Sequence, residues 1–272
     1  MPERDTAPAS DGRAVSPVVC AQPAIPVRDM AGKTHWDRTW ADRPPERYPG
    51  PIFEWHDLYR RVLPRNTAMT LLEVGAVPGN HLVYFAKEFG YKVAGIDYSS
   101  EFPQIAKTLA LNGVEPLGLF HEDVFRFCPH RLYDVVFSGG LVEHFDPPEP
   151  IIAVHAKLVA PGGWLLLAVP NTRYLHAWLM RLNCPEVLAV HNPALMSRAA
   201  LGGAVRQCGF EVLFCDYLQT FRTFYPLRPA FSFVCRAASK LVRFTRAHQI
   251  PNRYASPCLY LIARKPSPKG ED

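Results

Sequence analysis

The sequence lacks the marks of several protein classes. No apolar run reaches the ~18 residues that a membrane-spanning helix needs. The seven cysteines include no Cys-x-x-Cys pair and lie far apart, so we expect no metal site and no disulfide framework, and a reducing cytoplasm is favoured. The first residues include Glu3, Asp5, Asp11 and several prolines, so neither a secretory signal nor a transit peptide is expected.

Net charge is also modest, and it is unevenly distributed. The chain carries +5 at pH 7, but the part from Phe221 onward holds ten Lys or Arg against two acidic residues. Within it, 231–248 is typical of a helix with Arg236, Lys240 and Arg243 on one face. Three interpretations stay open: a solvated basic face on a lid helix, a peripheral membrane contact for a lipid-like substrate, or a nucleic-acid contact. Nucleic acid is the least favoured partner, because no RNA-binding module is visible.

Apolar residues are plentiful enough to form a sizeable core. They make up 48% of the 272 residues, which argues against general disorder. The composition and periodicity divide the chain into a disordered tail (1–28), an N-terminal helical lid (29–66), a main domain (67–266) with an insertion at about 219–255, and a short tail (267–272).

Short apolar strands alternate with amphipathic helices through the middle of the chain. Five such repeats with short connections predict a parallel sheet that helices cover on both faces. Two further strands follow, and the gap of about 37 residues between them requires an insertion. The expected strands are 70–75, 91–99, one within 114–124, 133–140, 164–171, 211–218 and 256–264; the expected helices are 52–62, 81–89, 101–113, 150–159 and 197–207.

Three motifs fall at the ends of consecutive expected strands. The first is the turn from Gly75 to Asn80, the second is Asp97, and the third is Asp123. In an open α/β sheet the ligand lies outside these strand ends, where glycine allows close backbone approach and a later acid accepts the ribose hydroxyls. Taken singly, the turn could be only a tight strand–helix connection, and Asp97 could be only a helix cap.

The loop itself limits the choice of nucleotide. A dinucleotide loop needs G-x-G-x-x-G, whereas Val77 occupies the middle position and Asn80 the last. A Walker loop needs Lys followed by Ser or Thr, and neither is present. A ligand with a ribose but no phosphate, such as S-adenosylmethionine, tolerates this more closed loop.

The stretches LLEVGAVPGN, YKVAGIDYS, HEDVF, YDVVFSGGLVEHFDPPEP and APGGWLLLAVPN together resemble the class I S-adenosylmethionine-dependent methyltransferases. The resemblance covers about residues 70–172 and implies a Rossmann-like α/β fold with a seven-stranded sheet. The departure from the family pattern is Val77-Pro78 in the loop. The resemblance implies that the cofactor is bound at its methionine part by Glu73, Gly75, Ala76, Gly79 and Asn80, at its ribose and adenine by Asp97, Tyr98, Asp123 and Val124, and from below by Ser138 and Gly139.

Candidates for the chemistry are fewer. His144 and His191 follow strands in segments that face substrate in such folds, and either could act as a base if the acceptor must lose a proton. His144 could equally pack beside the cofactor, and His191 could cap a turn. Trp36 and Trp40 are tentative substrate contacts in an aromatic lid, or ordinary packing residues. The remaining histidines have no motif context and are expected at the surface.

These observations predict an S-adenosylmethionine-dependent methyltransferase. The expected acceptor is an oxygen, nitrogen or carbon of a small molecule, either a secondary metabolite or a quinone-like or lipid-like compound. A methyltransferase acting on RNA or protein is one alternative. A methyltransferase-like protein that binds without catalysis, because the altered loop no longer holds the cofactor, is the other.

Overall fold

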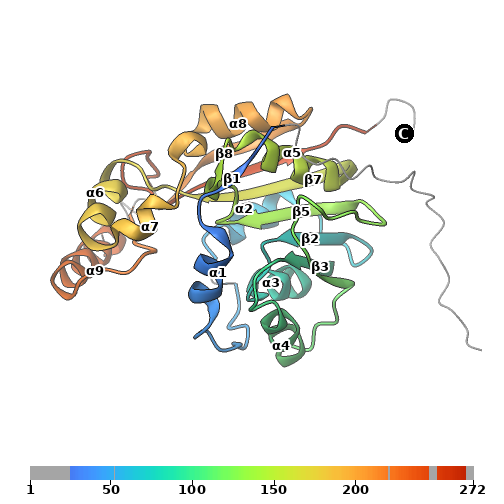
Figure 1. Ribbon diagram of the computed structural model, residues 1–272, viewed down its shortest axis with the longest axis horizontal. Coiled ribbons are helices and arrows are strands. Elements are labelled where there is room, and N and C mark those ends of the chain that lie inside the picture. The colour runs from blue at the N-terminus through green and yellow to red at the C-terminus, as the bar shows by residue number, and fades with distance from the viewer. Residues whose placement is uncertain (1–24, 52, 220, 245–249, 268–272) are drawn as a thin grey trace, which may run out of the picture.

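A seven-stranded sheet forms the centre of the computed structural model, which describes residues 25–51, 53–219, 221–244 and 250–267 (Figure 1). Its strands are β2 (Thr70–Val74), β3 (Lys92–Asp97), β4 (Gly118–His121), β5 (Tyr133–Gly139), β7 (Val159–Pro170), β8 (Glu211–Leu218) and β9 (Cys258–Arg264). Their order is β4-β3-β2-β5-β7-β9-β8. The first five strands pair in parallel, as predicted, whereas β9 is antiparallel to β7 and β8, a direction that the sequence does not specify.

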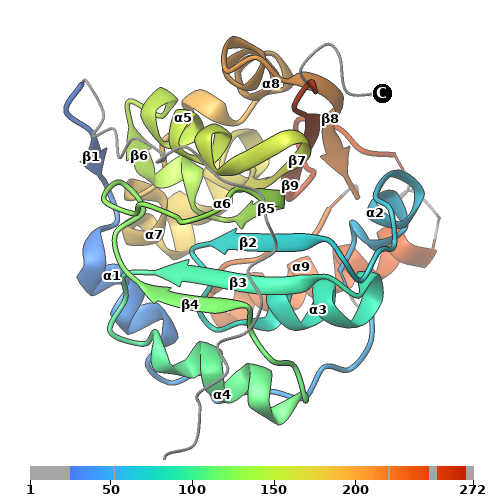
Figure 2. The same ribbon diagram turned by 90° about the vertical axis from the view of Figure 1, so that its right-hand side faces the viewer.

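Helices cover both faces of this sheet (Figure 2). The α-helices of the described residues are α1 (Gly32–Trp40), α2 (His56–Val62), α3 (Asn80–Phe89), α4 (Pro103–Leu111), α5 (Glu149–Leu158), α6 (Tyr174–Asn183), α7 (Pro185–Ala189), α8 (Arg198–Gln207) and α9 (Pro229–Phe244). Because side chains alternate along a strand, Leu71 packs toward α2 and α3 while Leu72 packs toward α5 and α8. Both leucines are fully buried, so the sheet separates two apolar layers, and the Rossmann-like fold class is confirmed.

The N-terminal segment adds a small second sheet that the sequence did not predict. β1 (Arg28–Asp29) pairs antiparallel with β6 (Phe145–Asp146), which follows the short 3-10 helix η1 (Val142–His144). The predicted tail to residue 28 is therefore too long at its end, since Arg28 already belongs to a strand. A two-residue strand is too short to show an alternating pattern, so only the folded partner reveals it. The rest of the predicted tail, 1–24, lies outside the described residues, as does the predicted tail from 268.

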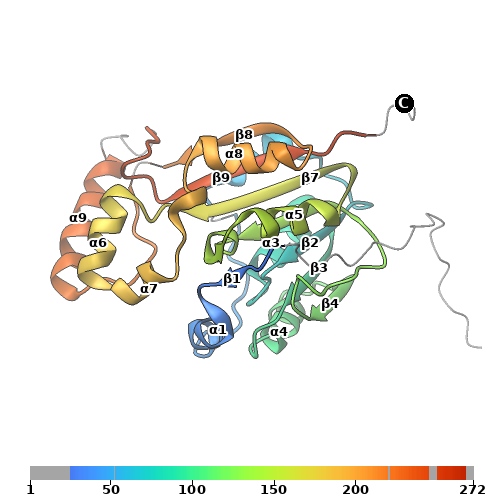
Figure 3. The same ribbon diagram turned by 45° about the horizontal axis from the view of Figure 1, so that its top comes forward.

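The segment between β7 and α8 contains two further helices, α6 and α7. Both helices pack with α9, from the insertion before β9, around a third apolar cluster. Its buried members are Leu179, Met180, Cys184, Tyr225 and Cys235. Figures 1 and 3 show α6, α7 and α9 as a group projecting beyond the carboxyl end of β7. Long-range packing of two separate segments creates this group, so local periodicity alone could not predict it.

Two expectations about chain-wide features can be compared with the described residues. Within them, no helix is both long and apolar enough to cross a membrane. Five of the cysteines there are free thiols, but Cys128 is disulfide-bonded.

Two histidines expected at the surface are instead fully buried. His155, in α5, donates its Nδ1 proton to the Ile151 carbonyl at 2.7 Å, within its own helix. His176, in α6, is bonded to the Tyr225 hydroxyl at 3.0 Å and the Ala255 carbonyl at 2.9 Å. Burial lowers the pKa of His155 to about 4, because the charged imidazolium would lose its hydration. Each of these rings therefore occupies a core position as a neutral, hydrogen-bonded group.

Replacing His155 by leucine should make the protein less sensitive to acid. The folded pKa lies below the unfolded value of 6.5, so the unfolded chain binds the extra proton as pH falls below 6.5 toward 4. This costs about 1.4 kcal/mol per pH unit, or about 2 kcal/mol between pH 6.5 and 5. Urea unfolding at pH 7 and pH 5 should show that His155→Leu loses less stability than the natural protein by about that amount. The exposed control His130→Leu should lose as much as the natural protein, and equal losses in all three would contradict the prediction.

Candidate active site

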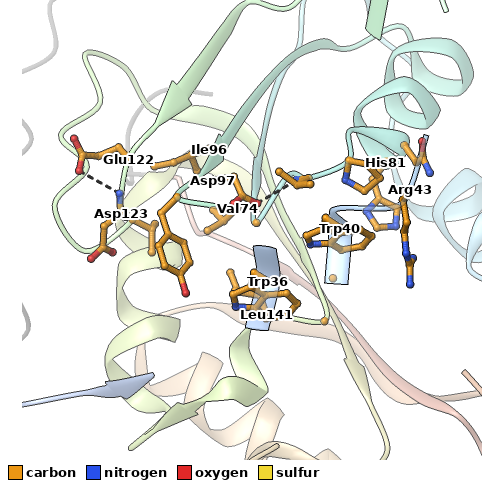
Figure 4. Close-up of a pocket in the computed structure, with 18 of the residues that line it drawn as sticks. Trp36, Trp40, Arg43, Val74, His81, Ile96, Asp97, Glu122, Asp123 and Leu141 are labelled. Atoms are coloured by element: carbon orange, nitrogen blue, oxygen red, sulfur yellow. Dashed lines mark hydrogen bonds between the residues drawn. The ribbon is translucent and has the colours of Figure 1, made fainter. Parts of the chain in front are cut away.

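A cavity of about 630 Å³ opens at the carboxyl ends of β2, β3 and β5 (Figure 4). Here the chain has passed from β2 outward to β3 and β4 and then returned to β5, which is the switch point where open α/β sheets bind ligands. Figure 4 shows Glu122 and Asp123 on one side of the cavity and His81, Trp40 and Arg43 on the other. Of the predicted site residues, the cavity is lined by Trp36, Trp40, Gly75, Asn80, Asp97, Tyr98, Asp123, Val124 and Gly139.

The turn from Gly75 to Asn80 has a defined left-handed geometry. Gly75 and Gly79 have φ values of 76° and 99°, which favour glycine. A Cβ on Gly79 would lie 3.3 Å from the Ile105 backbone, so α4 packs closely under the turn. The side chain of Val77 is buried in the apolar layer of α3. Val77 therefore stabilises the turn through core contacts, and both Val77 and Pro78 line the cavity in front of it.

Asp97 ends β3 and is fixed by backbone donors. The Val77 N–H donates to Oδ2 at 3.1 Å and the Ser99 N–H donates to Oδ1 at 2.8 Å. Burial raises the pKa of Asp97, and these two hydrogen bonds lower it again in part. Asp97 therefore joins the turn to the end of β3. It does not cap α4, whose N-cap residue is Phe102 and has no side-chain cap hydrogen bond.

The side of the cavity that was predicted to hold the adenine is assembled from β1 and from the residues that follow β3 and β4. The Tyr98 hydroxyl donates to Asp29 Oδ2 at 2.7 Å, and Asp29 Oδ1 accepts the N–H groups of Ala31 and Gly32 at the start of α1. Asp123 lines the cavity and accepts the Phe125 N–H at 2.9 Å. Asp29 was missed by the sequence analysis because it lies in the region expected to begin the lid, far from any recognised motif.

Four other predicted cofactor residues lie behind the cavity wall and are not among its lining residues. They are Glu73, Ala76, Gly79 and Ser138. Instead, Glu73 Oε1 accepts from the Nδ1 of His81 at 2.7 Å, and His81 lines the cavity. Burial raises the pKa of Glu73, and the contact with His81 opposes that shift.

His81 was expected at the surface, so this placement is a correction. It follows the loop directly, and an acid stands eight residues earlier in the strand that leads into the loop. This acid–histidine spacing across a strand, a turn and a helix start could have predicted that the two side chains meet. A Cβ on Gly139 would lie 3.5 Å from His81 Cε1, which places the imidazole directly beside the end of β5.

Helix α1 closes the cavity from the side opposite the sheet. The Ser100 N–H donates to Asp37 Oδ1 at 2.7 Å, and Gln104 Nε2 donates to the Trp40 carbonyl at 2.9 Å. These bonds attach α1 to the N-terminal end of α4. Trp36 and Trp40 both line the cavity, as expected for an aromatic lid over the strand ends.

His144 and His191 are close together but are not among the residues lining the cavity. Their ring centroids are 4.5 Å apart, and the Trp36 ring meets His144 edge-on at 4.8 Å. The Nδ1 of each donates to a backbone carbonyl, Val190 for His144 and Val187 for His191. Burial lowers the pKa of both, to about 3 for His144. In this arrangement His144 supports the lid residue Trp36 from behind.

A buried carboxyl group accompanies these two histidines. Among the residues that the structure describes, neither oxygen of Glu143 has a hydrogen-bond partner, and burial raises the pKa of this carboxyl group to about 8. One donor atom from each of Glu143, His144 and His191 lies within 4.8 Å of the others, a grouping that a metal ion could occupy. The sequence analysis predicted no metal, because it considered cysteine spacing and not residues brought together by the fold.

Comparison with known proteins assigns the chain to a family. A family model described as "Methyltransferase domain" matches residues 51–213, more than half of the chain. The chain belongs to the methyltransferase-domain family. The chain is 33% identical over 112 residues to a ubiquinone biosynthesis O-methyltransferase of Pectobacterium carotovorum subsp. carotovorum, covering 40% of this chain and 46% of that protein. It therefore spans about half the length of the curated relative.

Solved structures agree with the fold. A phosphoethanolamine N-methyltransferase of Haemonchus contortus in complex with S-adenosylmethionine has a TM-score of 0.55 at 14% identity, covering 88% of this chain and 59% of that one. The cyclase SpnF has a TM-score of 0.56 at 18% identity, covering 84% and 86%. At such identities the likeness shows the fold alone.

Proposed function

We propose that this methyltransferase transfers a methyl group from S-adenosylmethionine to a hydroxyl oxygen of a small aromatic molecule of the phenol or quinol class. The observation that carries the proposal is the cavity with carboxylates at one side and a His81–Glu73 pair at the other. The relatives' name supports an oxygen acceptor, since they are O-methyltransferases of ubiquinone biosynthesis.

The cavity suits a sulfonium nucleoside. Asp97 presents a carboxylate at the end of β3, and carboxylates accept paired hydroxyls well. Asp97 and Tyr98 would hold the ribose, Asp123 and Val124 the adenine, and Gly75, Asn80 and Gly139 the methionine part. When bound, the cofactor supplies an activated methyl group, so the protein has mainly to orient the acceptor oxygen.

Aromatic walls favour a flat acceptor. Trp36, Trp40 and Phe53 line the cavity, and rings of this kind bind aromatic molecules by stacking and edge contacts. The Arg43 guanidinium lies 4.7 Å from the centre of the Trp40 ring, so this wall is both apolar and cationic. An electron-rich phenol or catechol fits such a wall better than an aliphatic amine.

His81 is the base that we infer for the acceptor proton. With Glu73 ionised, Nδ1–H donates to Oε1, which leaves Nε2 free to accept the hydroxyl proton. The imidazolium formed is then stabilised by the buried carboxylate. We prefer His81 to His144 and His191, because it lines the cavity and they do not.

The direct test is a methyl-transfer assay on the purified protein. Radiolabelled S-adenosylmethionine is supplied with a panel of catechols, hydroxylated quinols, primary amines and transfer RNA. Methylation confined to the phenolic compounds, with the product mass raised by one methyl group, is the expected result. Transfer to amines or RNA would overturn the acceptor class. Binding of the cofactor with no transfer to any acceptor, across the whole panel, would favour the non-catalytic alternative.

A further inference from the structure

The projecting group of α6, α7 and α9 carries large apolar side chains in water. Trp178 is 54% exposed and Leu182 40% on α6, and Phe233 is 78% exposed and Val234 63% on α9. Such a concentration of exposed large apolar residues usually marks a binding surface. Contact with water is unfavourable for large apolar side chains, so their exposure here needs another explanation.

The two helices lie side by side, and each has exposed apolar residues of its own. Leu175, Trp178 and Leu182 are three and four residues apart, so they form one stripe along α6. The Trp178 ring meets the Phe231 ring of α9 at 6.5 Å, and the buried faces of α6 and α9 share one apolar cluster. We call the exposed residues of this pair the α6–α9 surface: Leu175, Trp178, Arg181 and Leu182 on α6, Arg228 directly before α9, and Phe233, Val234, Arg236 and Lys240 on α9.

Positive charge surrounds these apolar residues. Arg181, Arg228, Arg236 and Lys240 are all exposed. No Asp or Glu occurs between Asp216 and Glu271, so the insertion contains cations without acids. Among the described residues, the ion pairs found do not include any of these four cations.

We infer that the α6–α9 surface docks on the face of a membrane that contains anionic lipids. Arginine and lysine beside Trp, Phe and Leu is the composition of helices that lie in the interface, with apolar side chains among the acyl chains and cations at the headgroups. A nucleic acid would engage the cations but leave Phe233 and Val234 in water. An anionic membrane satisfies both sets of residues, so it is the one occupant that we propose.

The α6–α9 surface lies near the cavity, so docking on a membrane would also position the active site. α6 begins four residues after β7 ends, on the same edge of the sheet as the cavity. Figure 3 shows α6 and α7 on the side of the molecule where α1 lies. A docked molecule would therefore hold the cavity edge near the bilayer, where an apolar acceptor accumulates. The docking inference itself does not depend on which molecule is methylated.

Co-sedimentation with vesicles tests the inference on the full chain. We expect binding to vesicles of equal parts phosphatidylcholine and phosphatidylglycerol, weak binding to phosphatidylcholine alone, and release by added salt. The variants Trp178→Ser with Phe233→Ser, and Arg181→Glu with Arg236→Glu, should each lower the partition coefficient by about tenfold or more.

Matched control variants show whether the α6–α9 surface itself binds the vesicles, or whether any loss of an exposed apolar or basic residue weakens binding. Leu117→Ser removes an exposed apolar residue before β4, and Lys107→Glu reverses an exposed cation on α4; both should bind as the natural protein does. Unchanged melting temperatures establish that the paired variants are folded. Absence of vesicle binding by the natural protein, equal binding by the paired variants, or binding of an RNA oligonucleotide in place of vesicles would each overturn the inference.

Discussion

Replacing Asp97 by alanine is expected to weaken S-adenosylmethionine binding by about a hundredfold or more. The carboxylate would lose two hydrogen bonds from the ribose, each worth about 1.5–3 kcal/mol when one partner is charged. A total of about 3 kcal/mol corresponds to roughly a hundredfold in the dissociation constant. The change also releases the N–H groups of Val77 and Ser99, which Asp97 now holds, so the loop loses a support as well.

Isothermal titration calorimetry measures this loss directly. Asp216→Ala makes the same chemical change at an exposed position on β8, where the carboxylate pairs with Arg198, and it should leave affinity unchanged. Asp97→Asn keeps the shape and one acceptor oxygen, so its affinity should fall between those of the natural protein and the alanine variant. Natural affinity in a well-folded Asp97→Ala protein would show that the ribose is bound elsewhere.

Replacing His81 by glutamine should lower kcat by roughly a hundredfold to ten-thousandfold, the usual contribution of a positioned base. The amide cannot accept the proton of the acceptor hydroxyl, although it fills similar space beside Gly139. Because the loss falls on the chemical step, KM for the acceptor should change much less than kcat. Steady-state kinetics with the best phenolic acceptor of the panel, together with the cofactor dissociation constant, measures both quantities.

Two companion variants make this test discriminating. His191→Gln removes the competing candidate and should retain most of kcat, since His191 is not among the residues lining the cavity. Glu73→Gln keeps an acceptor for Nδ1 but not the charge, so an intermediate kcat is expected. A large loss in His191→Gln with little loss in His81→Gln would reverse the assignment. Inactivation by EDTA, with recovery on adding a divalent cation, would make Glu143, His144 and His191 metal ligands instead.

The candidate site could be predicted in part from local sequence. Gly75, Asp97 and Asp123 were found because each follows a strand, and the ends of parallel strands must meet at one edge of the sheet. His81 was missed because its importance depends on the contact with Glu73 and on the cavity beside it. Asp29 was missed for a similar reason: its bond to Tyr98 joins residues 69 positions apart.

The sequence by itself determined the strands, most of the helices and the family. Apolar runs and helical spacing are local properties of the sequence. A strand that is buried on both faces needs an apolar run, and a helix that packs on a sheet needs apolar residues at helical spacing, whichever segments they pack against. Only the tertiary structure decided the antiparallel direction of β9, the pairing of β1 with β6 and the joining of α6 to α9. It also decided that His155 and His176 are buried while His81 faces the cavity. These outcomes depend on which distant segments pack together. A long-range hydrogen bond needs both its donor and its acceptor, and a cavity needs all of its walls, so neither can be predicted from one segment alone.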